Sequence, residues 1–172
     1  VVRDSLQRSI FLRDYAASLH SDVSGEPVED ALILVALKGK VDDDILTEEE
    51  AALLRSFGLS SDLHSWEGHG WLAVIDGGRV VYETALREDE PDFMDSFEGE
   101  SGKLRYQLTS GRIDEETEVV HSAASIVVNG LEYATEDRGL HFAVFRKSTG
   151  ELMDSAWLDI HSYALEFTHD LH

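Results

Sequence analysis

A chain of 172 residues is long enough for one domain with a sizeable core, and its 42% hydrophobic content excludes a disordered chain. No apolar run approaches the ~20 residues of a membrane-spanning helix, so we expect no membrane insertion. The 35 acidic residues against 14 basic ones give a net charge of −21, which repels phosphate backbones and argues against nucleic acid as a partner. The absence of cysteine excludes disulfides and thiolate metal sites.

The charged residues also indicate the salt concentration in which the protein works. Lysine is scarce among the basic residues, and an acidic, lysine-poor surface is typical of proteins in high salt, where counterions screen self-repulsion. We therefore expect a halophilic system, with an ordinary acidic protein as the alternative. Residues 1–4 contain neither an initiator Met nor the start of a signal peptide. This predicts a mature form, a fragment, or a piece of a larger assembly.

The first 58 residues contain three predicted elements. Apolar residues within 1–20 recur at roughly helical spacing and predict a helical lead-in. Residues 31–37 (ALILVAL) form a continuous apolar run, short enough for a strand that is buried on both faces. Residues 47–50 (TEEE) form a capping box that opens a helix, and Gly58 stands where a C′ glycine would end it.

From residue 71 onward the chain is dominated by predicted hairpins. Asn129-Gly130 is the dipeptide that a two-residue type I′ turn requires. Apolar segments flank this turn and two others, which predicts three hairpins: 71–75 with 80–83, 126–128 with 131–133, and 140–145 with 151–156. The other predicted segments are strands at 104–108 and 119–123, a long acidic loop at 85–103, and a short helix at 161–172.

The sequence contains no recognised catalytic motif. There is no Gly-x-Ser-x-Gly elbow, no phosphate loop with its Lys, and no HExxH pair. The acidic run 42–44 lacks the turn glycine and the terminal Glu of a calcium loop. His169 and His172 have the spacing of a zinc pair, but their place at the chain end favours a frayed helix. We expect a non-enzymatic protein with no catalytic residues, no cofactor and no metal site.

A polar loop around one tryptophan is the candidate ligand site. Trp66 lies between Ser65 and Glu67, where an exposed ring could stack on a sugar or anchor a partner. His64 and His69 flank the same loop. We therefore expect His64, Trp66, Glu67 and His69 to form the ligand-binding set.

Two stretches together resemble the interleukin-like EMT inducer family. The first, 31–83, has a buried strand, the helix ALLRSFG (52–58), Trp66, and a strand that opens at Trp71. The second, 138–159, has the strand RGLHFAVF and the return strand STGELMDSAWLD, preceded by VVNGLEY. The resemblance assigns structural roles to seven motif residues: Gly58, Asn129, Gly130, Arg138, Gly139, Gly150 and Asp154.

The resemblance implies an α+β fold in which two mostly antiparallel sheets pack as a sandwich with flanking helices. Its members are secreted signalling factors and accessory domains of glycan-handling enzymes, and are not catalysts. The positions of one member's sugar-binding Asp and Arg are occupied here by Gly39 and Glu67. Sugar binding through an Asp–Arg pair at these positions is therefore not expected. The family's disulfides are absent too.

The family order is changed, because the Arg-Gly-Leu hairpin follows the helix here and precedes it in the family. Asp4-Ser5 also recurs as Asp154-Ser155. These features favour a permuted or end-swapped domain, with a slice through tandem domains as the alternative. We expect one domain, 1–172, whose residues 1–20 pack on a neighbour.

The predicted function is a non-catalytic structural or adhesion domain of a secreted, cell-surface or virion-surface assembly, such as a viral tail or capsid accessory. Protein partners or self-association are expected. The alternative is a carbohydrate-binding module of a glycan-handling protein.

Overall fold

The computed structural model describes residues 28–39, 48–61, 68–87, 94–114, 120–135, 138–158 and 167–171. The predicted helix in 1–20, the acidic run 42–44 and the capping Thr47 lie outside these residues. No helix in the described residues is long and apolar enough to cross a membrane.

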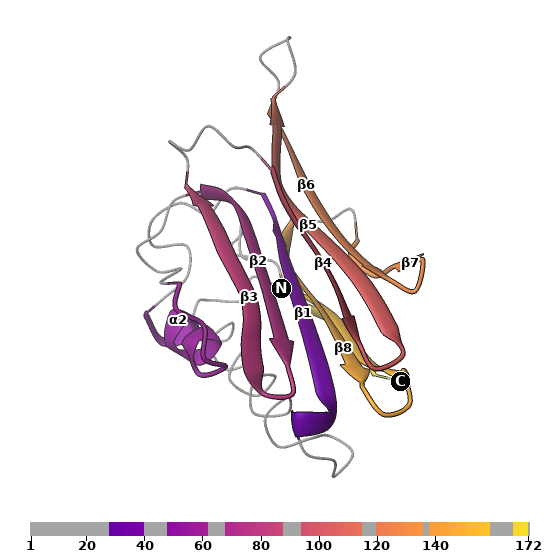
Figure 1. Cartoon of the computed structure of the whole chain (residues 1–172). Helices are drawn as coiled ribbons and strands as arrows, with labels where there is room; N and C mark the ends of the chain where they lie inside the picture. Colours follow the sequence, from indigo (N-terminus) through magenta and orange to yellow (C-terminus); the bar gives the residue numbers. More distant parts are fainter. Residues whose placement is uncertain are drawn as a thin grey trace.

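The described residues form two sheets in which all neighbouring strands are antiparallel (Figure 1). The larger sheet has the order β10-β9-β8-β1-β2-β3, with β1 Ala31–Lys38, β2 Gly68–Asp76, β3 Arg79–Arg87, β8 Gly139–Arg146, β9 Leu152–Leu158 and β10 Phe167–Leu171. The smaller sheet has the order β4-β5-β6-β7, with β4 Met94–Ser101, β5 Leu104–Asp114, β6 Val120–Val128 and β7 Leu131–Glu132. The predicted pair of mostly antiparallel sheets is confirmed.

Helix is scarcer than predicted. Among the described residues there is one α-helix, α2 Glu48–Arg55, and one short 3-10 helix, η1 Val28–Asp30. Figure 1 shows α2 on the side of the larger sheet that faces away from the smaller sheet. The expectation of several flanking helices is therefore not met in this part of the chain, which has α2 as its only α-helix, because long-range strand pairing satisfies most of the backbone.

Strand β1 explains why the run ALILVAL is apolar at every position. Leu32 and Leu34 point into the cluster between the sheets, which β5 and β6 complete with Leu108 and other side chains. Ile33 and Val35 point to the opposite face, where they join a second cluster. Because side chains alternate along a strand, a central strand with both faces covered must be apolar throughout.

The second cluster joins distant parts of the chain. Leu54 of α2 and Phe142 of β8 belong to it, together with Trp71 at the centre of β2. Trp71 is 1% exposed, as predicted for a core residue. Strand β8 pairs with β1 along the whole of β1, so the C-terminal hairpin lies directly beside the first strand.

All three predicted hairpins form. In the β6–β7 turn, Asn129 has φ 49° and Gly130 has φ 84°, the pair of positive angles that a type I′ turn needs. The hairpins β2–β3 and β8–β9 also match their predicted segments. The predicted strand 104–108 is part of the longer β5, and residues 120–123 of the other predicted strand belong to β6, which pairs with β5. Val119 lies outside the described residues.

Two predicted segments are corrected. Most of the acidic loop expected at 85–103 is strand, because β3 runs to Arg87 and β4 covers Met94–Ser101. In β4 the acidic Glu98 and Glu100 occupy the exposed positions, while the inward positions carry one large apolar residue, Phe97, among polar and small ones. The alternation of apolar and polar residues that marks a strand was therefore not recognisable in the sequence of β4. Phe167–Leu171, expected in a terminal helix, is β10, because pairing with β9 decides its conformation.

Aromatic rings close the side of the sandwich where β3 faces β4. The rings of Tyr82 and Phe97 stack with centroids 4.1 Å apart, and Phe97 also contacts Tyr106. The Tyr82 hydroxyl donates a hydrogen bond to Asp95. Burial, the hydrogen bond to Asp95 and the negative charge of Asp95 together raise the pKa of Tyr82 to about 12. The two edge strands are thus joined by side chains rather than by a backbone ladder.

A buried serine ties the sheets together at the end of the β1–β2 ladder. The last paired residues in that ladder are Ala36 and Leu72. Beyond them, the Trp71 amide donates to the Ser110 hydroxyl oxygen at 3.0 Å, and this hydroxyl donates to the Leu37 carbonyl. Ser110 is fully buried in β5. Its hydroxyl thus replaces the next rung between two strands of the other sheet.

The segment after α2 is held by a carboxylate on β3. Gly58 ends the helical turn with φ 92°, as predicted for a C′ glycine, and its amide donates to the Arg55 carbonyl at 2.9 Å. Glu83 then accepts hydrogen bonds from the Ser60 amide and hydroxyl at 2.8 and 2.9 Å and from the Ser61 amide at 2.7 Å. Burial alone would raise the pKa of Glu83, but these hydrogen bonds outweigh it and the net pKa is lowered.

Acidification is therefore expected to weaken this anchor. A lowered folded-state pKa contributes stability that is present above the unfolded-state pKa of about 4.5 and is lost as pH falls through the folded-state value. Glu83→Gln should lower the free energy of unfolding by about 1 kcal/mol at neutral pH, a value reduced for partial solvent exposure. Urea unfolding of both proteins from neutral pH downward checks this. If the difference in free energy of unfolding between the wild type and Glu83→Gln stayed constant through pH 4.5 and below, the prediction would be wrong.

Candidate functional site

The outer face of the smaller sheet carries polar side chains in cross-strand register. In β5, Leu104, Tyr106 and Leu108 point inward and are buried, so Arg105 and Gln107 point outward and are exposed. Glu100 of β4 lies opposite Arg105, and Glu98 lies opposite Gln107. Charged and amide groups from two strands are thus presented together.

This face is hollowed between the strands. A cavity of about 510 Å³ opens there, within the range of small-ligand sites, and the residues that line it come from three adjacent strands: Glu98, Gly99, Glu100, Arg105, Tyr106, Gln107 and Val127. Val127 of β6 lies opposite Gln107 and adds an apolar wall. Carboxylate, guanidinium and amide groups therefore converge on one hollow.

Hydrogen bonds fix the backbone of Arg105, whereas its guanidinium group is accessible to solvent. The Arg105 backbone amide donates to the Asn129 side-chain oxygen at 2.9 Å. The Asn129 backbone amide donates back to the Arg105 carbonyl at 2.8 Å. The guanidinium pairs with Glu100 at 2.8 Å, but the two side chains are 80% and 65% exposed. An ion pair this exposed adds little to stability, so the guanidinium can exchange partners at low cost.

A row of hydroxyls lies next to the hollow on the same face. The hydroxyls of Ser96 and Thr109 are 3.1 Å apart in a hydrogen bond. Ser125 lies opposite Thr109 and donates its hydroxyl hydrogen bond to Glu132. Hydroxyl groups both donate and accept, so this row can match ligand hydroxyls of either orientation.

The predicted ligand set does not coincide with this hollow. His64, Trp66 and Glu67 lie outside the described residues. His69 is half-buried in β2, a strand of the larger sheet, whereas the hollow lies on the smaller one. Among the described residues no group of three or more His, Asp or Glu is arranged to hold a metal ion.

The motif residues occupy turns and buried strand positions. Gly150 has φ 78° in the β8–β9 turn, and Gly139 is buried at the start of β8. The Arg138 carbonyl accepts a hydrogen bond from the Trp157 indole at 2.8 Å. Asp154 is 3% exposed in the centre of β9. Asn129 and Gly130 make the turn that fixes the Arg105 backbone.

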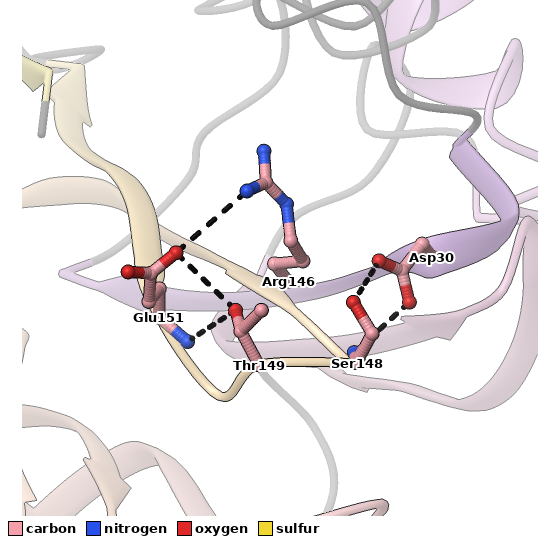
Figure 2. Close-up of polar contacts among 5 residues, drawn as sticks. All are labelled: Asp30, Arg146, Ser148, Thr149 and Glu151. Carbon is pink, nitrogen blue, oxygen red and sulfur yellow. Dashed lines mark hydrogen bonds and ion pairs between the residues drawn. The ribbon is translucent and has the colours of Figure 1, made fainter.

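A second polar cluster, at the β8–β9 turn, is occupied by its own contacts (Figure 2). The Ser148 amide and hydroxyl donate to the two carboxylate oxygens of Asp30 at 2.9 and 2.6 Å. Thr149 donates to Glu151 at 3.3 Å and accepts from the Glu151 amide, and Arg146 pairs with the same carboxylate at 3.6 Å. The bonds from Ser148 fasten the hairpin to η1, and the contacts of Glu151 lie within the hairpin. We therefore assign this cluster a structural role.

Sequence reasoning missed the hollow because it placed Glu98 and Glu100 in a loop. A signal was available, since the polar alternations Glu-x-Glu and Arg-x-Gln flank the turn dipeptide Gly102-Lys103. Such a pattern predicts a hairpin with one polar face.

Comparison with known proteins adds no relative: no family model matches the chain, and no curated protein or solved structure matches it significantly. The resemblance to the interleukin-like EMT inducer family stays a prediction.

Proposed function

We propose that the chain is a non-catalytic binding domain, a structural or adhesion module of a secreted, cell-surface or virion-surface assembly, and that it meets its partner through the outer face of the smaller sheet. The observation that carries this is the hollow lined by Glu98, Glu100, Arg105 and Gln107. Its polar groups stand on paired strands with an apolar core beneath them, so little backbone conformational entropy is lost on binding.

A protein partner would be recognised here by charge and hydrogen bonding. Arg105 offers donors to a carboxylate, while Glu98 and Glu100 offer acceptors to a Lys or Arg. A face with both signs of charge selects a partner with the complementary arrangement. The high net charge of the chain restricts the approach of acidic partners elsewhere on its surface.

The test is reversal of one exposed charge. Arg105→Glu should leave folding intact, because the side chain is 80% exposed, and should weaken binding at this face at least about tenfold. The full chain and the variant would be applied to arrays of extracellular proteins and of glycans, with affinities measured for the hits. Thr149→Ala, at the structural β8–β9 turn, is the control that should bind normally. Hits that Arg105→Glu leaves unchanged would sink the proposal.

A carbohydrate ligand is the second candidate. The hydroxyls of Ser96, Thr109 and Ser125, beside the planar groups of Gln107 and Arg105, suit a hydroxyl-rich ligand. Binding of a neutral glycan that is lost in Arg105→Glu would favour this candidate over a protein partner.

The proposed halophilic setting predicts a strong dependence on salt. With a net charge of −21, the folded chain repels itself at low ionic strength, and KCl screens that repulsion. The midpoint of urea unfolding should therefore rise steadily from low to molar KCl. A midpoint that is already maximal at low salt would contradict the prediction, and repeating the series with NaCl separates screening from an effect specific to K⁺.

A further inference from the structure

In the part of the chain that the structure describes, one edge of the smaller sheet has no strand partner over most of its length. Strand β7 covers β6 only at Val127 and Val128. Among the described residues no other strand pairs with β6 on the side away from β5. Figure 1 shows β7 beside one end of β6 and no labelled strand beside the rest of that edge. The open part runs from Val120 to Ser125.

The direction of the open backbone groups follows from the hairpin. The Tyr133 amide donates to the Ile126 carbonyl at 2.8 Å, and the Ile126 amide donates to Glu132 at 2.8 Å, so Ile126 points both groups away from β5. Because this direction alternates along an antiparallel strand, Ala124, Ser122 and Val120 also point their amides and carbonyls to the open edge.

Glu132 defines where this edge ends. Its carboxylate accepts hydrogen bonds from the Ser125 hydroxyl, the Ile126 amide and, at 2.9 Å, the Ala134 amide. This side chain occupies the place of the next backbone rung. The edge is therefore closed at Ile126 and open before it, which leaves a segment of defined length.

The composition of the open segment is unusual for an edge strand. Residues 120–125 (VHSAAS) contain no acidic residue, no Lys and no Pro, in a chain with a net charge of −21. Natural proteins protect exposed edges with charges, Pro or bulges, and this edge has none of them. Four of its six side chains are Ser or Ala, so little side-chain bulk stands beside an approaching strand.

We propose that this edge pairs with the same edge of a second copy of the chain. In an antiparallel β6–β6 pair centred on Ser122, Ser122 faces its symmetry mate and Val120 faces Ala124. Every backbone amide and carbonyl that points to the open edge between Val120 and Ala124 then has a partner, which gives about six main-chain hydrogen bonds. The pair is isologous, so it closes as a dimer and does not propagate.

The self-complementary pairing of this edge selects a second copy as the occupant, and the local charge permits it. Two chains of −21 repel each other over most of their surfaces, but this edge brings together stretches without acidic residues. The dimer joins two smaller sheets into one continuous sheet, with the two hollows on the same face. Dimerisation does not depend on ligand binding at the hollow, so the two proposals can fail separately.

The experiment measures the mass of the full chain by analytical ultracentrifugation over a range of concentrations at high KCl. The wild-type protein should be a dimer, and Ser122→Pro should raise the dimer Kd at least about tenfold. Proline removes an amide that points to the open edge and leaves the β5–β6 ladder intact, so its thermal unfolding should stay close to wild type. A wild-type monomer at every concentration would overturn the proposal.

Two further measurements keep the test decisive if the proline variant folds poorly. Ala123→Glu places a like charge beside the proposed twofold axis and should weaken the dimer, whereas Ser96→Glu, on the same face of β4, should not. In amide hydrogen exchange, Ser122 and Ala124 should gain protection as the concentration rises, while Ala123 and Ser125 should be protected throughout. A dimer whose Ser122 amide exchanges rapidly has its interface elsewhere and refutes the proposal.

Discussion

Replacing Ser110 with alanine is expected to lower the free energy of unfolding by about 2–6 kcal/mol. The substitution removes one hydroxyl, but it leaves two backbone groups, the Trp71 amide and the Leu37 carbonyl, buried without that partner. Ser110 is fully buried, so water cannot replace the hydroxyl without opening the space between the sheets. Each orphaned group costs about 1–3 kcal/mol, and the two costs add because both strands depend on the same side chain. Urea or guanidinium unfolding measures the loss.

A matched control is available in the same sheet. Ser96→Ala removes an exposed hydroxyl that bonds only to the Thr109 hydroxyl at 3.1 Å, and should change stability by less than about 0.5 kcal/mol. In hydrogen exchange, Ser110→Ala should selectively increase opening at Trp71, at the end of the β1–β2 ladder. Equal stability of the two variants would show that the Ser110 hydroxyl does not tie the sheets.

The second large effect is expected at Gly99. A Cβ built on this glycine would overlap the Tyr106 hydroxyl oxygen and would lie 2.5 Å from the ring carbon that carries it. Tyr106 is 6% exposed and its ring packs in the cluster between the sheets, so it has little room to move. Gly99→Ala should therefore destabilise the protein by about 1–3 kcal/mol through overpacking, although alanine suits a strand better than glycine.

A double-mutant cycle separates this clash from a backbone effect. Tyr106→Leu removes the ring, so adding Gly99→Ala to that variant should cost little, with a coupling of at least about 1 kcal/mol. Glu100→Ala, at the neighbouring exposed position, is the control and should be nearly neutral. If Gly99→Ala were equally costly with and without the tyrosine ring, contact with Tyr106 would not be the reason that glycine is present.

The candidate surface could be predicted only in part. Polar residues alternate along residues 98–107, but the sequence does not state that the two halves pair, or that the inward positions Gly99 and Ser101 belong to a strand. Small inward residues are acceptable there because the Tyr106 ring crosses under Gly99 from the neighbouring strand. Such cross-strand filling depends on register, which the local pattern of β4 does not specify.

Local chemistry was sufficient wherever neighbouring residues decide the conformation. The run 31–37, the turn Asn129-Gly130 and the C′ Gly58 were all predicted, because their signals lie within a few adjacent positions. Only the tertiary structure decided that β4 and β10 are strands, that Ser110 of one sheet bonds two strands of the other, and that no described strand covers most of the outer edge of β6. These features rest on hydrogen bonds between residues distant in the chain, whose partners no local pattern can identify.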